Sequence, residues 1–201
     1  MPAPALSACT HTDGLPPAKV YDRANGYTPA MDPRESTIVD ITSASLPNLI
    51  QQARDLLAEY GAFLQARPEA AHVCFGSLAH ETARLPLSYE EQGGGVLLAQ
   101  VGSEAAGMVA WRVVPGPFSA HSWEIKRLWV RPAARGLALG RRLTHAILDR
   151  AAAAGRRAVY LDTIPAAMPE ALSLYRKIGF TPCAPYAGEA NDGVTYFVKF
   201  L

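Results

Sequence analysis

The stretch from Glu124 to Arg142 decides the fold of this chain and reads EIKRLWVRPAARGLALGRR. Its first half, within residues 123–130, is rich in bulky side chains and predicts a β-strand, which Pro132 ends. A loop of small residues follows, and the apolar residues around and after Gly140 recur at the spacing of a helix. The stretch therefore predicts a strand, a glycine-bearing loop and a helix in direct succession.

The start of that helix has the chemistry of an anion site. The first backbone N–H groups of a helix have no partner within it, and the helix dipole favours negative charge at this end. Small residues let a ligand approach the backbone, and Arg135, Arg141 and Arg142 add positive charge. A diphosphate would suit such a loop, although an ordinary strand-to-helix turn with solvated arginines explains the same residues.

After this helix the chain continues to alternate between strands and helices. Residues 158–163 read as a buried strand. Pro169 suits the first turn of a short helix, and Gly179 suits the position just beyond its end. Phe180 opens another strand, and residues 194–201 alternate as a final one.

The part of the chain before this stretch predicts a short strand over residues 37–41 and then two helices. Ser45 is expected to cap the first helix, with Pro47 in its first turn. Residues 74–84 predict the second helix. The apolar stripe of the first helix consists of Leu46, Leu49, Ile50, Ala53, Leu57, Tyr60 and Leu64.

Two strands, residues 96–101 and 107–114, are expected to flank a hairpin turn at residues 102–104. The full order is then strand, two helices, three strands, helix, strand, helix and two strands. This order predicts an α/β (α+β) fold, in which a mixed, mostly antiparallel twisted sheet is flanked by helices on both faces.

Residues 1–35 differ in composition from the rest, because they contain six prolines and few large aliphatic side chains. Proline blocks helices and removes backbone donors, and the segment has little to bury. We predict an N-terminal tail or arm over residues 1–35, either flexible or binding a partner, and a single domain over residues 36–201.

Composition excludes several classes of protein. The chain has 201 residues, 49% of them hydrophobic, and a formal net charge of +1, with no apolar run long enough to cross a bilayer. So balanced a charge predicts no binding to nucleic acid or to a membrane surface. The three cysteines are far apart and the histidines form no metal-ligand spacing, so we expect no structural metal. With no secretory signal at the start, we expect a cytoplasmic protein.

Two motifs resemble those of the GNAT superfamily of acetyltransferases. The loop, Arg135-x-x-Ala138-x-Gly140, resembles the acyl-CoA-binding pattern Q/R-x-x-G-x-G/A. The segment from Ala171 to Phe180, ALSLYRKIGF, is similar to the family's A-x-x-L-Y-x-x-x-G-F. The resemblance covers roughly residues 37–201, with both motifs in the family's order.

The chain departs from the family pattern at two positions. Ala138 replaces the middle glycine of the loop, and its methyl group is expected to fit only if its φ stays negative and its Cβ turns away from the phosphates. Met168 stands about where many members carry an asparagine, so any polar contact of that asparagine must be missing or replaced.

The resemblance implies an acetyl-CoA-dependent N-acetyltransferase, with acetyl-CoA as cosubstrate and no metal. The diphosphate would lie on the loop amides, and the pantetheine arm on a strand that splays from residues 158–163. The implied cofactor-binding residues are Leu128, Trp129, Val130, Arg135, Gly136, Leu137, Ala138, Leu139, Gly140 and Arg141.

Two residues are candidates for the proton transfers. Glu124 would be the base, directly or through water, although a carboxylate paired with Lys126 or Arg127 explains it equally. His121 is a second candidate for the base. Tyr175 would be the acid for the departing thiolate if the family geometry holds, and otherwise a packing tyrosine.

The acceptor is expected to be a primary amine of a small molecule or amino acid. Segments that wall the acceptor pocket in the family correspond to Tyr186, Glu189, Asn191, Asp192, His80, Glu81 and Arg84, all of which also suit plain surface loops. Transfer to a protein or peptide, transfer of another acyl group, and a catalytically idle CoA-binding module stay open as alternatives, as does a homodimer.

Overall fold

The computed structural model describes residues 20–22, 26–28, 36–70, 78–188 and 190–201. The strands are β1 (Val20–Asp22), β2 (Gly26–Thr28), β3 (Ser36–Ile41), β4 (Gly95–Val101), β5 (Glu104–Val113), β6 (Ser122–Val130), β7 (Ala158–Thr163), β8 (Thr181–Cys183) and β9 (Thr195–Phe200). The helices are α1 (Pro47–Gln65), α2 (Leu78–Ala83), α3 (Leu87–Glu90), α4 (Leu139–Ala153) and α5 (Pro169–Ile178). Short 3-10 turns cover Pro68–Ala70, Gly116–Phe118 and Pro132–Ala134.

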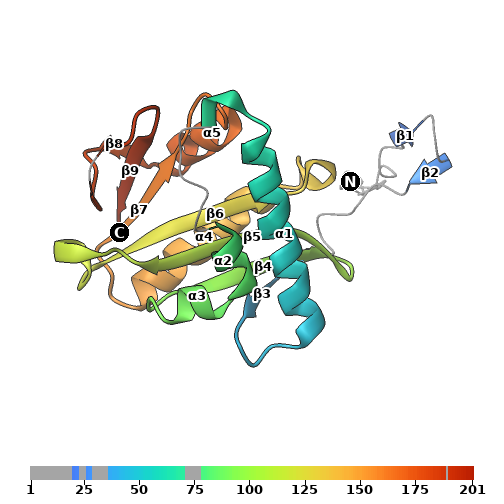
Figure 1. Cartoon of the computed structure of the whole chain (residues 1–201), viewed down its shortest axis with the longest axis horizontal. Helices are drawn as coiled ribbons and strands as arrows, with labels where there is room; N and C mark the ends of the chain where they lie inside the picture. The colour runs from blue at the N-terminus through green and yellow to red at the C-terminus, as the bar shows by residue number, and fades with distance from the viewer. Residues whose placement is uncertain (1–19, 23–25, 29–35, 71–77, 189) are drawn as a thin grey trace, which may run out of the picture.

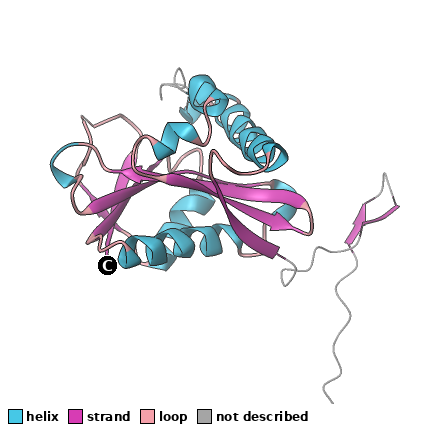
Figure 2. Ribbon diagram, turned by 90° about the horizontal axis from the view of Figure 1, so that it is seen from below, coloured by secondary structure: helices cyan, strands magenta, loops and turns pink. Residues whose placement is uncertain are grey.

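Seven strands form one mixed sheet in the order β3-β4-β5-β6-β7-β9-β8 (Figure 1). Every neighbouring pair is antiparallel except β6 and β7. Helices cover both faces, as Figure 2 shows. The predicted mixed, mostly antiparallel sheet flanked by helices is confirmed.

The two faces of the sheet bury two separate apolar clusters. Along β4, Leu97 and Ala99 pack toward α4 and α5, while Val96 and Leu98 pack toward α1. Because both faces are covered, this strand is apolar at nearly every position and does not alternate with polar residues. The edge of β6 next to the loop before α4 lies between these two layers.

Helix α1 corrects two details of the prediction. Its N-cap is Leu46, which is 66% exposed, and not Ser45. The Ser45 Oγ accepts a hydrogen bond from the Thr42 N–H at 2.9 Å in the preceding turn, so it is not used to cap the helix. Leu56, absent from the predicted stripe, is fully buried in the cluster under α1.

The other predicted elements lie close to the observed ones. The hairpin turn is tighter than expected, because Val101 already pairs with Glu104. The predicted helix over residues 74–84 corresponds to α2, and its first residues lie outside the described ranges. The short helix α3, which follows Pro86, was not predicted.

Most of the predicted tail lies outside the described residues. Its described parts, β1 and β2, pair with each other and form no ladder with the seven-stranded sheet. The division at residue 35 stays a prediction.

Candidate active site

The loop between β6 and α4 ends in a helix start without a side-chain cap. Ala138 is the N-cap residue, and no side chain accepts a hydrogen bond from the first turn of α4. The φ of Ala138 is +56°, so the expectation of a negative φ at this position is wrong. Gly136, at φ +88°, also lies in the region that favours glycine. The loop thus keeps a left-handed turn even though alanine replaces the middle glycine.

This loop borders a groove of about 380 Å³, which we call the loop groove. Its walls are residues of α1, β6, the loop, α4 and α5: Phe63, Leu128, Trp129, Val130, Ala134, Arg135, Gly136, Ala138, Leu139, Gly140, Arg141, Met168, Glu170, Ala171 and Leu174. They include every predicted cofactor-binding residue except Leu137, which packs against the core under α4.

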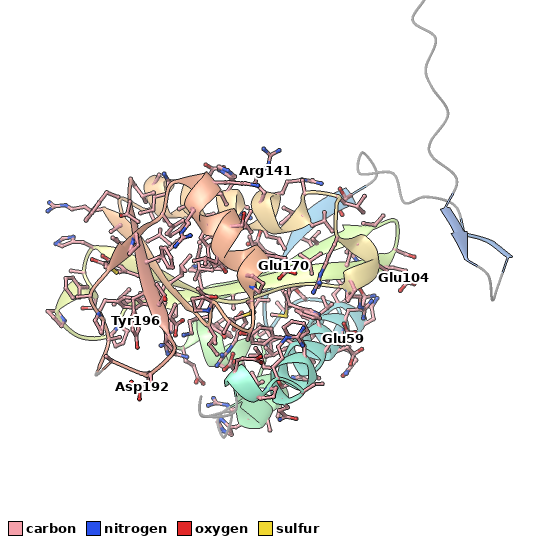
Figure 3. The ribbon with its side chains drawn as sticks, turned by 90° about the horizontal axis from the view of Figure 1, so that it is seen from above. Glu59, Glu104, Arg141, Glu170, Asp192 and Tyr196 are labelled. Carbon is pink, nitrogen blue, oxygen red and sulfur yellow. The ribbon has the colours of Figure 1, made fainter. Side chains whose placement is uncertain are left out.

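Two arginines give the loop groove its positive charge. Arg135 and Arg141 line it, together with the carboxylate of Glu170 in the first turn of α5. In Figure 3, Arg141 and Glu170 come from the helices on one side of the sheet and Glu59 from α1 on the other. Arg142 is used differently, because its guanidinium binds the Oγ and the carbonyl oxygen of Ser36.

Next to the loop groove, the sheet opens between its two parallel strands. The pairing of β6 with β7 runs from Ser122–Ala158 to Ile125–Leu161, although both strands continue. On its other edge, β6 carries a bulge, where the register with β5 shifts between Met108 and Ala110. Arg127 stands there at φ +57°. The two strands therefore splay, as the resemblance implies.

A small cavity of about 70 Å³, which we call the strand gap, lies at this opening. Its walls are Tyr60, Leu64, Leu78, Ile125, Lys126, Arg127, Leu128, Asp162, Thr163, Ile164, Met168, Ala171, Tyr175 and Val194. It shares Leu128, Met168 and Ala171 with the loop groove. Met168 offers a thioether where the family pattern has an amide, so no hydrogen-bonding side chain stands at that position.

Glu124 is buried, with 2% of its surface exposed, and both of its oxygens accept hydrogen bonds. Oε2 accepts from Arg112 Nε at 2.7 Å. Oε1 accepts from Lys126 Nζ at 3.2 Å and from the Tyr186 hydroxyl at 2.7 Å. Of the two cationic partners considered from sequence, Lys126 is bound and Arg127 is not, because Arg127 binds Glu81.

Tyr175 lines the strand gap while its ring packs in the core. The ring lies edge-on to Phe180, with centroids 5.8 Å apart. Burial, with smaller effects from Tyr60 and Asp162, raises the pKa of the Tyr175 phenol well above its ordinary value. The hydroxyl therefore keeps its proton at neutral pH and is a donor.

Sequence reasoning missed Asp162 of the strand gap, and it considered Lys126 only as a partner of Glu124. Lys126 Nζ lies 2.9 Å from Asp162 Oδ1 and bridges this carboxylate to Glu124. Burial raises the pKa of Asp162, but the charge and hydrogen bond of Lys126 outweigh it and hold the pKa below its ordinary value. Burial lowers the pKa of Lys126, and Asp162 and Glu124 outweigh that effect in turn. Asp162 stands in a strand whose sequence is mostly apolar, so the sequence pattern does not indicate that its side chain faces the strand gap.

A third hollow of about 360 Å³, which we call the polar cavity, opens beyond Lys126 and Arg127. It is lined by His80, Glu81, Arg84, Ser88, Tyr89, Glu91, Gln92, Arg112, Lys126 and Arg127. Three of the predicted acceptor-side residues, His80, Glu81 and Arg84, are therefore together. Lys126 and Arg127 also line the strand gap, so the three hollows follow one another along β6.

The remaining candidates lie elsewhere. Tyr186 is buried against Glu124, and Asn191 and Asp192 line a separate hollow near Gly193. Glu189 lies outside the described residues. His121 is exposed just before β6 and lines none of the three hollows.

The described residues contain neither a candidate metal site nor a helix that could span a membrane. No group of His, Cys, Asp or Glu side chains among them could hold a metal ion. None of the described helices is both long enough and apolar enough to cross a membrane.

Comparison with known proteins gives a consistent result. The model of the acetyltransferase (GNAT) family matches residues 50–180. An uncharacterized N-acetyltransferase from Schizosaccharomyces pombe is 30% identical over 159 residues, 79% of this chain and 92% of that relative. An IAA acetyltransferase from Azospirillum brasilense is 40% identical over 76 residues, 38% of this chain and 49% of that relative, so the match spans about half of its length. The structure of yncA from Salmonella typhimurium with its cofactor acetyl-CoA aligns with a TM-score of 0.57 at 18% identity, over 83% of this chain and 94% of that one.

Proposed function

The chain belongs to the GNAT family of acetyltransferases, which are acyltransferases, and we propose that it transfers an acetyl group from acetyl-CoA to the primary amine of a small molecule or amino acid. The observation that carries this proposal is the row of three adjoining hollows along β6. The loop groove would hold the diphosphate, the strand gap the thioester, and the polar cavity the acceptor.

The cosubstrate fits the residues present. Uncapped amides at the start of α4, with Arg135 and Arg141, suit a diphosphate. Beyond Ile125, the edge of β6 that faces β7 has no partner strand among the described residues, although β5 still pairs with the other edge, so the free edge can receive the amides of a pantetheine arm. Acetyl-CoA would supply the activated acetyl group at the strand gap.

In the proposed reaction, the amine nitrogen attacks the thioester carbon, a C–N bond forms, and the C–S bond breaks with its electron pair going to sulfur. A backbone N–H of residues 128–130 would donate to the carbonyl oxygen, a contribution of about 3 kcal/mol. Tyr175 would give its hydroxyl proton to the departing sulfur, so that CoA leaves as the free thiol, and the proton lost by the amine would return through the base to the tyrosinate. The proton lost by the amine goes to a base.

Glu124 is our proposed base, acting through water. Its burial and its three donors leave no room for direct contact with an amine. Asp162, whose side chain is 33% exposed, is the carboxylate of the strand gap that an amine can reach. If Glu124 is the base, Glu124→Gln lowers kcat about 100-fold and Asp162→Asn much less. The reverse order of effects would assign the base to Asp162.

The first test is calorimetric titration with acetyl-CoA, followed by thiol release with a panel of amines. Gly140→Leu should abolish binding, because a side chain at Gly140 meets Leu174 at 3.3 Å and fills the groove. Ala152→Leu, exposed in the last turn of the same helix, is the matched control and should bind normally. Failure of the intact protein to bind acetyl-CoA would refute the proposal, and binding without thiol release would leave a CoA-binding module.

The role of Tyr175 is tested by Tyr175→Phe, which keeps the ring and deletes the hydroxyl. We expect kcat to fall about 100-fold with unchanged acetyl-CoA affinity, at the lower end for general acids because a thiolate leaves readily. The matched control is Tyr160→Phe, a buried tyrosine outside the three hollows, which should keep kcat. An unchanged kcat in Tyr175→Phe, with chemistry limiting turnover, leaves that residue a packing role only.

A further inference from the structure

The polar cavity has a wall rich in cationic side chains. Arg84, Arg112, Lys126 and Arg127 line it, against two carboxylates, Glu81 and Glu91. Glu124, which neutralises Arg112 and Lys126, is buried behind this wall and is not part of the lining. Each of these cations is paired, Arg84 with Glu91, Arg127 with Glu81, and Arg112 and Lys126 with Glu124, so an entering anion would bind through the guanidinium N–H groups that these pairs leave unused.

Hydrogen-bond donors outnumber free acceptors on this wall. Arg112 uses Nε for Glu124 and Nη1 for Gln92, and within the described part of the chain its Nη2 has no acceptor. Among the described residues, the Arg84 guanidinium donates from Nη2 to Glu91 and has no other acceptor. Both oxygens of Glu81 already accept from Arg127, so this carboxylate is not free to hold a cation. The unpaired N–H donors of Arg84 and Arg112 would therefore bind an anion with several acceptor oxygens.

A hydrogen-bond acceptor for the amine stands in the strand gap, which adjoins the polar cavity at Lys126 and Arg127. Asp162 stands there as a partly exposed carboxylate, held by Lys126 from one side. Its carboxylate can accept a hydrogen bond from an amine that enters the gap. Among the described residues that line the strand gap, Asp162 is the one carboxylate, and it stands beside Lys126 and Arg127.

We propose that the acceptor carries a carboxylate beside its amine, as an amino acid does, with the carboxylate bound by Arg84 and Arg112 and the amine directed to Asp162 in the strand gap. Guanidinium groups match carboxylates through paired N–H donors, which favours this anion for the arginine wall. The inference rests on the proposed transfer to an amine and specifies the acceptor.

The test compares the common L-amino acids with their decarboxylated amines as acceptors in the thiol-release assay, after acetyl-CoA binding has been established by calorimetry. We expect one or more amino acids to be acetylated, and the matching decarboxylated amines to show at least a tenfold lower kcat/KM. Equal or better use of the amines lacking a carboxylate overturns the inference while leaving the acetyltransferase proposal intact. Use of no amino acid at all overturns it as well.

Variants of Arg84 then locate the carboxylate. Arg84→Met should raise KM for the accepted amino acid roughly tenfold or more, the size expected for a lost charged hydrogen bond, with kcat and acetyl-CoA affinity kept. Arg150→Met is the matched control, because Arg150 is also a surface arginine paired with one carboxylate, at similar exposure, and lines none of the three hollows. Its KM should be that of the parent protein.

Glu91→Gln should change KM for the amino acid in the direction opposite to Arg84→Met. It removes the carboxylate that competes for Arg84, so KM for the amino acid should fall or stay level. A KM that rises equally in Arg84→Met, Arg150→Met and Glu91→Gln would show a general structural effect and overturn the assignment to Arg84.

Discussion

Ala138 holds a conformation that alanine adopts at a cost. At φ +56° an L-side chain loses about 1–2 kcal/mol relative to its preferred regions. Glycine would remove that cost but adds freedom to the unfolded chain, so we expect Ala138→Gly to raise the free energy of unfolding by about 0.5–1 kcal/mol. Urea unfolding measures this difference.

A matched variant on the same helix should behave in the opposite way. Ala152 is exposed within the last turn of α4, where its backbone is helical. Ala152→Gly should lower the free energy of unfolding by about 0.5–1 kcal/mol. If both variants lose stability to the same extent, the left-handed turn is not strained by alanine.

Asp162 makes stability depend on pH in the acid range. Its pKa is lowered in the fold, because the pairing with Lys126 outweighs burial. A lowered pKa gives stability that is present above the ordinary value of about 4 and is lost as pH falls through the folded value. The parent protein should therefore lose stability more steeply than Asp162→Asn between about pH 5 and pH 2. Urea unfolding across this range measures both slopes, and parallel curves would contradict the prediction.

At the scale of elements, α1 is tied to the end of β6 through one carboxylate. Glu59 accepts from Trp129 Nε1 at 3.3 Å and from Arg131 Nη2 at 2.8 Å, and Trp129 and Arg131 stand at the strand end that leads into the loop. Glu59→Ala leaves the indole N–H without its acceptor, and we expect a loss of about 1–2 kcal/mol in unfolding free energy.

The same change should weaken acetyl-CoA binding, because Phe63 of α1 and Trp129 form one wall of the loop groove. Calorimetry measures that affinity. Glu59→Gln keeps an oxygen acceptor and should lose less unfolding free energy and less acetyl-CoA affinity than Glu59→Ala. Unchanged affinity in Glu59→Ala would mean that α1 does not position this wall.

Elements whose ends are set by neighbouring residues could be predicted from the sequence. Helix α5 begins at Pro169 and ends before Gly179, at φ +95°, as expected from local chemistry. The capping of α1 could not, because Ser45 had a competing partner in its own turn. Capping residues therefore predict where a helix begins or ends only when no other hydrogen bond competes for their side chains.

The loop groove was predictable and the strand gap was only partly so. The residues of the loop are consecutive, so one motif brings them together. The environment of Glu124 depends on the bulge near Arg127 and on Arg112 and Tyr186, which come from β5 and from the segment after β8. Such contacts arise from strand register, which a sequence pattern does not determine.

At the scale of the whole molecule, the seven-stranded sheet is complete from Ser36 onward. Deleting residues 1–35 should therefore leave a folded domain, with its free energy of unfolding within about 0.5 kcal/mol of the parent protein. Urea unfolding and circular dichroism of the shortened chain measure this. A shortened chain that does not fold would place the domain boundary earlier.

The short pairing of β6 with β7 divides the sheet into two plates. Among the described residues, the backbone ladder that joins the plate of β3 to β6 to the plate of β7, β9 and β8 consists of the register pairs from Ser122–Ala158 to Ile125–Leu161, and the Lys126–Asp162 ion pair crosses just beyond it. Beyond these register pairs, which we call the seam, the two parts of the sheet can move relative to each other. A pantetheine arm bound between β6 and β7 would restrict that motion. Amide hydrogens of β7 and β9 should then exchange with solvent more slowly once acetyl-CoA is bound, including those that the ligand does not touch. Exchange rates that are the same with and without acetyl-CoA would mean that the seam alone holds the plates rigid.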